Sequence, residues 1–228
     1  MGTSLPDEDD IMQLPPLESE LSVPLSVLHE DPLIGVATLN RDLWIERVNA
    51  RWLELHTGGS RPCADGAPLS TLFDPPQAAE WQRLIERALR ENGPLGLLAI
   101  RAGRRVQSTV RPLERDAVIV LTVAGECEPG EPAPFEVVES AVVDLGELDR
   151  LTRRELEVLA LVGRGLGRER IAAALYRSPK TVDNHMAAIL AKLGAGGRAD
   201  LIKHASRAGL RLEHAALPRT GSRRGLSA

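Results

Sequence analysis

The sequence predicts an α+β domain, built on an antiparallel five-stranded sheet with helices, followed by an all-α domain of four helices. Three observations predict this arrangement. The chain has 228 residues and is 43% hydrophobic, which suits two small globular domains. Apolar residues follow strand and helix periods in the first half, but only helix periods in the second. Residues 125–147, rich in Gly, Pro and Glu, separate the halves and predict a linker.

The α+β domain is expected over residues 25–124, in the order two strands, helices, three strands. Asn49 follows the second strand and is expected to cap a short helix that ends at Gly58-Gly59. A longer helix over about 76–91 carries apolar residues at i, i+3, i+4, i+7 and i+8. The remaining expected elements are a short helix at 26–30 and strands at 33–39, 43–48, 95–101, 104–113 and 117–123.

Four short helices are expected within residues 148–212. Thr152 and Glu155 have the spacing of a capping box, which predicts a helix start at Thr152. Ser178 and Pro179 are a favourable N-cap and first residue for the third helix, which Gly194 ends. The second and fourth helices are expected at 168–176 and from 198 to about 208. A tight turn between the second and third helices is the helix-turn-helix layout.

The charges of the two halves are opposite in sign. Residues 148–228 contain 16 Lys and Arg against 7 Asp and Glu, whereas residues 1–147 contain 12 against 25. A basic domain joined to an acidic one is typical of a polyanion-binding protein. We expect the acidic part to fold back on the basic domain and compete with DNA.

The ends of the chain and its composition exclude several classes of protein. Residues 1–24 are acidic and Pro-rich and predict a disordered tail; residues 213–228 predict a disordered basic tail. No apolar run is long enough to span a bilayer, and no basic residue precedes Arg41 as a secretory leader requires. We therefore expect a cytoplasmic protein without membrane contact. Cys63 and Cys127 are too few for a disulfide scaffold or a zinc site of thiolates.

The third helix, residues 179–193, is expected to be the recognition helix. One face is apolar, with Val182, Met186, Ile189 and Leu193 spaced at helical intervals. The other face is polar at its N-terminal end and carries alanines behind, so it can enter a major groove about 12 Å wide. This face consists of Lys180, Asp183, Asn184, Ala187, Ala188 and Ala191.

Residues 151–202 resemble the DNA-binding domain of LuxR-type bacterial transcription regulators. Ordered motifs carry the resemblance: Leu151-Thr152-x-Arg154-Glu155, Ile171-Ala172, Ser178-x-x-Thr181-Val182, Asn184-His185, Ile189-Leu190-x-Lys192-Leu193 and Arg198. The resemblance implies a homodimer that binds double-stranded DNA and contacts RNA polymerase. It implies base contacts from Lys180, Asp183, Asn184 and Ala187, and phosphate contacts from Thr181 and Lys192. In that family the last helix pairs two protomers, so Ile202 and Ala205 would pack across a dimer or into the core.

Three residues depart from the LuxR pattern. Arg170 replaces the usual Glu, Arg177 replaces an apolar residue, and Asp183 stands where a Lys or Arg is common. An acidic side chain weakens the attraction to phosphates but accepts a hydrogen bond from cytosine N4. These departures support an alternative, a protein-interaction module with weakened DNA binding.

The first domain resembles a PAS domain in its element order and in two segments, GVATLNRDLWIERVNARWLELHTG and DGAPLSTLF. The resemblance implies a sensory or dimerisation domain that receives a small-molecule or protein signal. We expect no cofactor, because the helix at 76–91 contains no His for haem and Cys63 lacks the motif of a light-sensing flavin site. A phosphorylated receiver is excluded, since residues 1–147 contain no Lys.

Together the two halves predict a sequence-specific DNA-binding transcription regulator whose activity a PAS-like domain modulates. We expect no enzyme activity and no metal site, because the chain lacks a nucleophile–base spacing and a phosphate-binding Gly-rich loop. A sensor whose main task is to capture a small molecule remains a third alternative.

Overall fold

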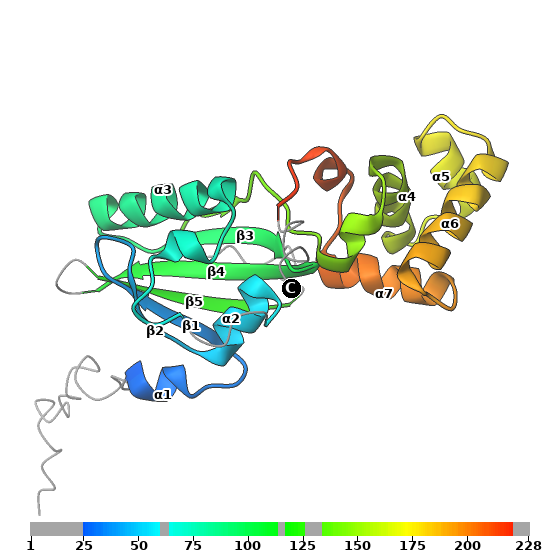
Figure 1. Cartoon of the computed structure of the whole chain (residues 1–228). Coiled ribbons are helices and arrows are strands. Elements are labelled where there is room, and N and C mark those ends of the chain that lie inside the picture. The colour runs from blue at the N-terminus through cyan, green and yellow to red at the C-terminus, as the bar shows by residue number, and fades with distance from the viewer. Residues whose placement is uncertain (1–24, 60–63, 114–116, 126–133, 221–228) are drawn as a thin grey trace, which may run out of the picture.

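The computed structural model of the chain describes residues 25–59, 64–113, 117–125 and 134–220. A sheet with helices occupies one end of the molecule, and a group of four helices occupies the other (Figure 1). Each end has its own cluster of buried apolar residues. In the described residues, no helix is long and apolar enough to cross a membrane.

In the described residues, six strands form a single sheet in the order β2-β1-β5-β4-β3-β6. All neighbours are antiparallel except β3 and β6, which are parallel. The order two strands, helices, three strands, on which the PAS resemblance rests, is confirmed. The strands are β1 Gly35–Leu39, β2 Ile45–Val48, β3 Leu95–Arg101, β4 Arg104–Pro112, β5 Val118–Ala124 and β6 Val137–Glu139.

Asn49 joins the first hairpin to helix α2, Ala50–Thr57. Its side-chain oxygen accepts from the backbone N–H groups of Trp52 at 2.8 Å and Val36 at 2.9 Å. Its amide nitrogen donates to the carbonyl of Ile34 at 2.8 Å. One short polar side chain therefore caps the helix and fixes it to β1, as the sequence predicts for the cap.

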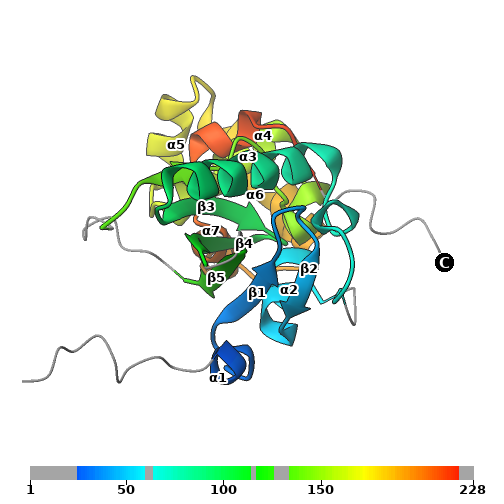
Figure 2. The same cartoon turned by 90° about the vertical axis from the view of Figure 1, so that its left-hand side faces the viewer.

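Helices α2 and α3, Pro75–Glu91, lie on one face of the sheet (Figure 2). Between helices and sheet, the rings of Trp52, His56, Phe73 and Trp81 form a cluster with centroids 4.3–6.1 Å apart. His56 Nε2 lies 3.0 Å from the hydroxyl of Thr122 on β5. Helix α1, Leu25–His29, contacts β1.

The predicted five-stranded sheet and linker need correction at residues 134–147. Val137–Glu139 form β6, a sixth strand that pairs with β3, and Val142, Val143 and Leu145 are buried. The described part of the predicted linker is thus packed against the sheet. A strand of three residues is too short to show an alternation of apolar and polar residues. The prediction of a linker therefore rested on the Pro and Glu content of the segment.

The C-terminal domain contains the four expected helices. They are α4 Arg153–Gly163, α5 Arg168–Ala174, α6 Pro179–Leu193 and α7 Arg198–Ala208. The capping box of Thr152 and Glu155 and the N-cap of Ser178 are both formed. Helices α5 and α6 lie farthest from the sheet, whereas α7 lies beside its end (Figure 1).

The predicted basic tail also needs correction. Residues 209–220, here called the C-terminal strap, return to the linker after α7. Ala215 and Thr220 are each only 5% exposed, and Thr220 N–H donates to the Val143 carbonyl at 2.8 Å. The small residues of this segment suggested a disordered tail, but in the structure they pack against the linker and the helical domain. The rest of that tail, and the N-terminal tail over 1–24, lie outside the described residues.

Candidate nucleic-acid interface

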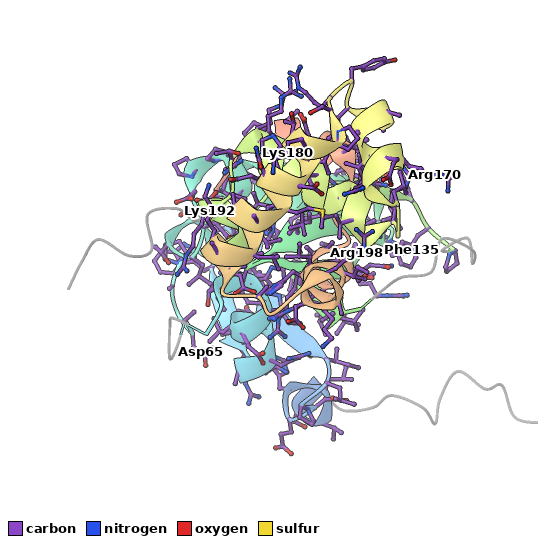
Figure 3. All side chains as sticks on the ribbon, turned by 90° about the vertical axis from the view of Figure 1, so that its right-hand side faces the viewer. Asp65, Phe135, Arg170, Lys180, Lys192 and Arg198 are labelled. Atoms are coloured by element: carbon purple, nitrogen blue, oxygen red, sulfur yellow. The ribbon has the colours of Figure 1, made fainter. Side chains whose placement is uncertain are left out.

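The polar face of α6 is open to solvent. Lys180, Asn184 and Ala187 are exposed, Asp183 is partly exposed, and Val182 and Ile189 on the opposite face are buried. Lys180 lies on the outer surface of the helical domain (Figure 3). We call Lys180, Asp183, Asn184 and Ala187 the α6 strip. The described part of the acidic half leaves this strip uncovered, so the expected fold-back is not seen there.

The N-terminus of α6 offers hydrogen-bond donors beside the strip. Ser178 Oγ accepts from the Thr181 backbone N–H at 3.1 Å, and the two hydroxyls are 2.9 Å apart. The cap fixes the first turn of the helix. Pro179 has no N–H and the N–H groups of Thr181 and Val182 bond to Ser178, so the Lys180 N–H is the first-turn donor that the cap does not use. Such helix termini favour anions, and the exposed Arg170 (Figure 3) and Arg177 add positive charge nearby.

Asp183 has a partner that the sequence analysis missed. Nη1 of Arg168, at the start of α5, lies 3.5 Å from Asp183 Oδ2. Arg168 also donates to Glu169 at 2.7 Å, which raises the pKa of the guanidinium. The positive charge offsets the acidic departure within the strip. Arg168 and Asp183 are 15 positions apart on different helices, so no local pattern could have shown the contact.

Lys192, a predicted phosphate contact, lies at the other end of α6 and is bound to α4. Its ammonium is 2.6 Å from Oε2 of Glu155, a side chain that is 7% exposed. An ammonium has three donors, so this ion pair leaves capacity for a phosphate. The phosphate contact therefore stays a prediction, now combined with a packing role that joins α6 to α4.

The predicted dimer residues separate in the structure. Ala205 is 2% exposed and packs against Gly163, where a Cβ would lie only 2.5 Å from the Ala205 Cβ. Of the two places expected for Ala205, the core of the domain is therefore the one in which the structure puts it. Ile202 is half-buried, so a part of its side chain remains open to a second protomer.

Residues 149–205, which include α4 to α6 and most of α7, match the family described as bacterial regulatory proteins, luxR family. The chain carries a LuxR-type helix-turn-helix domain. The same domain is 42% identical over 55 residues to the oxygen regulatory protein NreC of Staphylococcus aureus strains JH9 and JH1. That match covers 24% of this chain and 25% of the length of those relatives.

Several solved structures are similar to the chain over more of its length. A structure of VqmA bound to DPO is 21% identical, covers 79% of this chain and 84% of that chain, and has a TM-score of 0.36. A Vibrio cholerae VqmA dimer is 19% identical, covers 86% and 93%, and has a TM-score of 0.42. A sensory box histidine kinase of Vibrio cholerae is 19% identical and covers 44% of this chain and 85% of its own, with a TM-score of 0.34.

Proposed function

We propose that the chain is a bacterial transcription regulator that binds duplex DNA as a homodimer, with α6 in the major groove. The observation that carries this proposal is the exposed α6 strip within a LuxR-type domain. Lys180 and Asn184 are one turn apart on the same face, which suits contacts to neighbouring bases. The regulator acts in the cytoplasm, where the DNA lies, and contacts RNA polymerase through another surface of the domain.

The first test is selection of DNA by the purified full-length protein, followed by binding measurements on the selected site. Lys180→Ala and Asn184→Ala each relax the choice of base and weaken binding to the selected site by about 1–3 kcal/mol. Thr181→Ala weakens binding to all sequences alike, because a phosphate contact carries no sequence information. The selected half-site spacing reports the oligomeric state.

Lys203→Ala is the matched control, since Lys203 is an exposed lysine on α7, outside the α6 strip. It leaves base choice unchanged. Unchanged selection by both Lys180→Ala and Asn184→Ala would show that α6 does not enter the groove. Binding without a steep dependence on salt would instead favour the protein-interaction alternative.

The PAS-like domain is proposed to receive the signal that adjusts DNA binding. Three buried polar groups in its core lack a hydrogen-bond partner within the part of the chain that the structure describes: the Gln77 side-chain amide and the Nε1 atoms of Trp52 and Trp81. Buried polar groups without a partner are costly and rare. These groups support a small hydrogen-bonding molecule as the signal, and no cofactor is proposed.

A further inference from the structure

We propose that Glu80 is a positioning residue that ties helix α3 to the linker and thereby sets the orientation of the DNA-binding domain. This inference rests on the proposed function for its consequence, because only a DNA-binding protein has a half-site spacing to set. The contacts themselves are independent of that function.

The Glu80 carboxylate connects three segments of the chain. Its Oε2 accepts from Arg101 Nη2 on β3 at 2.8 Å and from the Ser140 hydroxyl at 2.7 Å. Its Oε1 accepts from the Ala141 backbone N–H at 2.8 Å. The side chain of Glu80 is 12% exposed, and that of Arg101 is fully buried. Helix, strand and linker thus share one shielded carboxylate.

The charges of Glu80 and Arg101 make the contact between α3 and the linker depend on one arrangement of these groups. A buried guanidinium that loses its carboxylate is strongly destabilising, because water no longer solvates the charge. Hydrogen bonds that involve ionised groups are also about twice as strong as neutral ones. The linker therefore cannot slide along α3 without breaking the set of contacts that neutralises Arg101.

The linker passes this constraint to the C-terminal strap. Val143, two residues after Ala141, donates its N–H to the Pro218 carbonyl at 3.0 Å and accepts from Thr220. Arg219 Nη1 in turn donates to the carbonyl of Leu151 at 2.8 Å, just before α4. The DNA-binding domain is therefore held by the same short segment that Glu80 holds.

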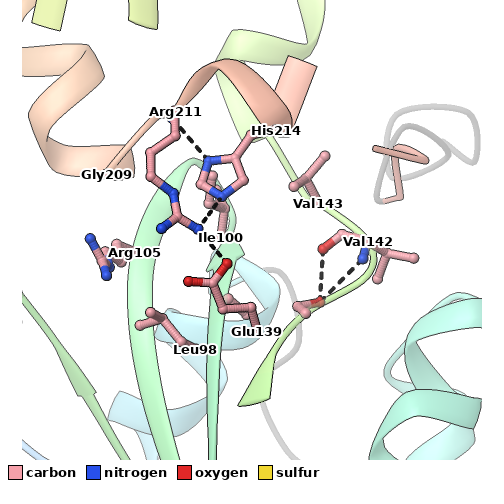
Figure 4. A pocket seen from close by; sticks show the side chains of 11 residues that line it. Leu98, Ile100, Arg105, Glu139, Val142, Val143, Gly209, Arg211 and His214 are labelled. Carbon is pink, nitrogen blue, oxygen red and sulfur yellow. Dashed lines mark hydrogen bonds and ion pairs between the residues drawn. The ribbon is translucent and has the colours of Figure 1, made fainter. Parts of the chain in front are cut away.

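A second contact closes the joint between sheet and strap. Arg211 of the strap forms an ion pair with Glu139 of β6, and His214 lies beside it (Figure 4). The Arg211 N–H donates to His214 Nδ1 at 3.0 Å, and burial lowers the pKa of this imidazole. A neutral ring with Nδ1 as acceptor is consistent with this contact.

The side of α3 next to Glu80 faces the core, where Gln77 and Trp81 are buried. Gln77 and Trp81, which carry polar groups without a partner in the described residues, are three residues before and one residue after Glu80. A molecule that binds Gln77 would displace the turn that bears Glu80. The displacement would reach the linker directly, through contiguous contacts.

Hydrogen exchange on the full-length protein tests the joint without DNA. In Glu80→Gln, one carboxylate oxygen is replaced by an amide NH2 group, which cannot accept a hydrogen bond from Arg101, Ser140 or Ala141. The weakened contacts are expected to raise the exchange rates of the backbone amides of Ala141, Val143 and Thr220 about tenfold or more. Exchange in α4 and in β5 stays as in the wild type. Glu86→Gln is the matched control, because Glu86 lies on α3 and its exposed carboxylate accepts from the Gln82 side chain of the same helix at 2.8 Å, away from the linker.

A spacing series on the selected DNA tests the consequence. The wild type is expected to prefer one half-site separation by about tenfold over separations changed by one or two base pairs. Glu80→Gln reduces that preference to about twofold, while affinity for a single half-site stays unchanged. Glu86→Gln retains the wild-type preference.

The outcomes separate the two proposals. Unchanged exchange at the joint, or an unchanged spacing preference in folded Glu80→Gln, overturns the role of Glu80. A wild type that binds no duplex overturns the proposed function, while exchange still decides whether Glu80 holds the joint. Should Glu80→Gln fail to fold, Ser140→Ala replaces it, with Ser140→Thr expected to restore the hydroxyl contact and the wild-type exchange.

Discussion

At the residue scale, a single carboxylate can join several elements of this fold, and Glu155 is an example. It accepts from the Thr152 backbone N–H at 2.7 Å and from Lys192 at 2.6 Å, so it caps α4 and holds the end of α6. Burial acts to raise the pKa of Glu155, but the hydrogen bonds from Lys192 and Thr152 outweigh it and hold the pKa below its usual value. The ionised form is therefore the one that stabilises the domain.

Glu155→Gln is expected to lower the free energy of unfolding by about 1–3 kcal/mol at pH 7. Because folding depresses the pKa, this contribution is complete above the unfolded value of about 4.3 and is lost as pH falls through the folded value. Urea unfolding at several pH values should show the difference from the wild type narrowing below about pH 4. Glu169→Gln, an exposed site on α5, is the control with little effect. A difference that is constant with pH would contradict this account.

At the scale of elements, the turn between β3 and β4 fits closely against the linker. Gly103 has a φ of +71°, and a Cβ there would lie 2.8 Å from the Leu145 carbonyl oxygen. Its N–H donates to the Asp144 carbonyl at 3.0 Å. The turn can pack in this way only because residue 103 has no side chain.

Gly103→Ala is expected to cost about 2–4 kcal/mol of unfolding free energy, from left-handed backbone strain plus the clash. Gly66→Ala separates the two causes, because Gly66 has a φ of +74° but nothing within 4 Å of its added Cβ. It should cost only about 1 kcal/mol. Chemical denaturation measures both, and equal losses would show that the close approach to the linker contributes nothing.

The sequence predicts elements whose residues interact locally and misses those whose partners are distant. Capping residues such as Thr152, Ser178 and Asn49 and the apolar stripes of α3 and α6 were sufficient to place their helices. Strand β6 and the strap are short, and their hydrogen bonds are made with distant segments, β3 and the linker. In the candidate interface the strip follows from helical spacing, whereas the Arg168–Asp183 contact requires the packing of two helices.

At the scale of the whole molecule, charge and shape act together. The sheet with its helices lies at the end of the molecule away from α6 (Figure 1), and residues 1–147, to which it belongs, carry a large excess of Asp and Glu. The described part of this domain does not touch the strip, so it repels DNA through its electric field. Such a field is screened over about 10 Å at 0.1 M salt.

Removal of residues 1–124 is therefore expected to give a protein that binds non-specific duplex more tightly than the full chain at low salt. The difference should disappear near 0.5 M salt, because the screening length then falls to a few ångströms. Fluorescence anisotropy over a salt series measures both proteins on one labelled duplex. Equal affinity at every salt concentration would show that the acidic half has no electrostatic effect on binding.

The aromatic cluster beneath α3 gives the protein a built-in optical reporter. Of its three tryptophans, Trp52 and Trp81 are fully buried in the cluster, whereas Trp44 is 46% exposed. An aqueous quencher such as iodide reaches Trp44 and reduces its fluorescence, but it does not reach Trp52 or Trp81, whose fluorescence remains. The unquenched emission therefore reports events inside the PAS-like core, including the arrival of a guest molecule, without any attached dye.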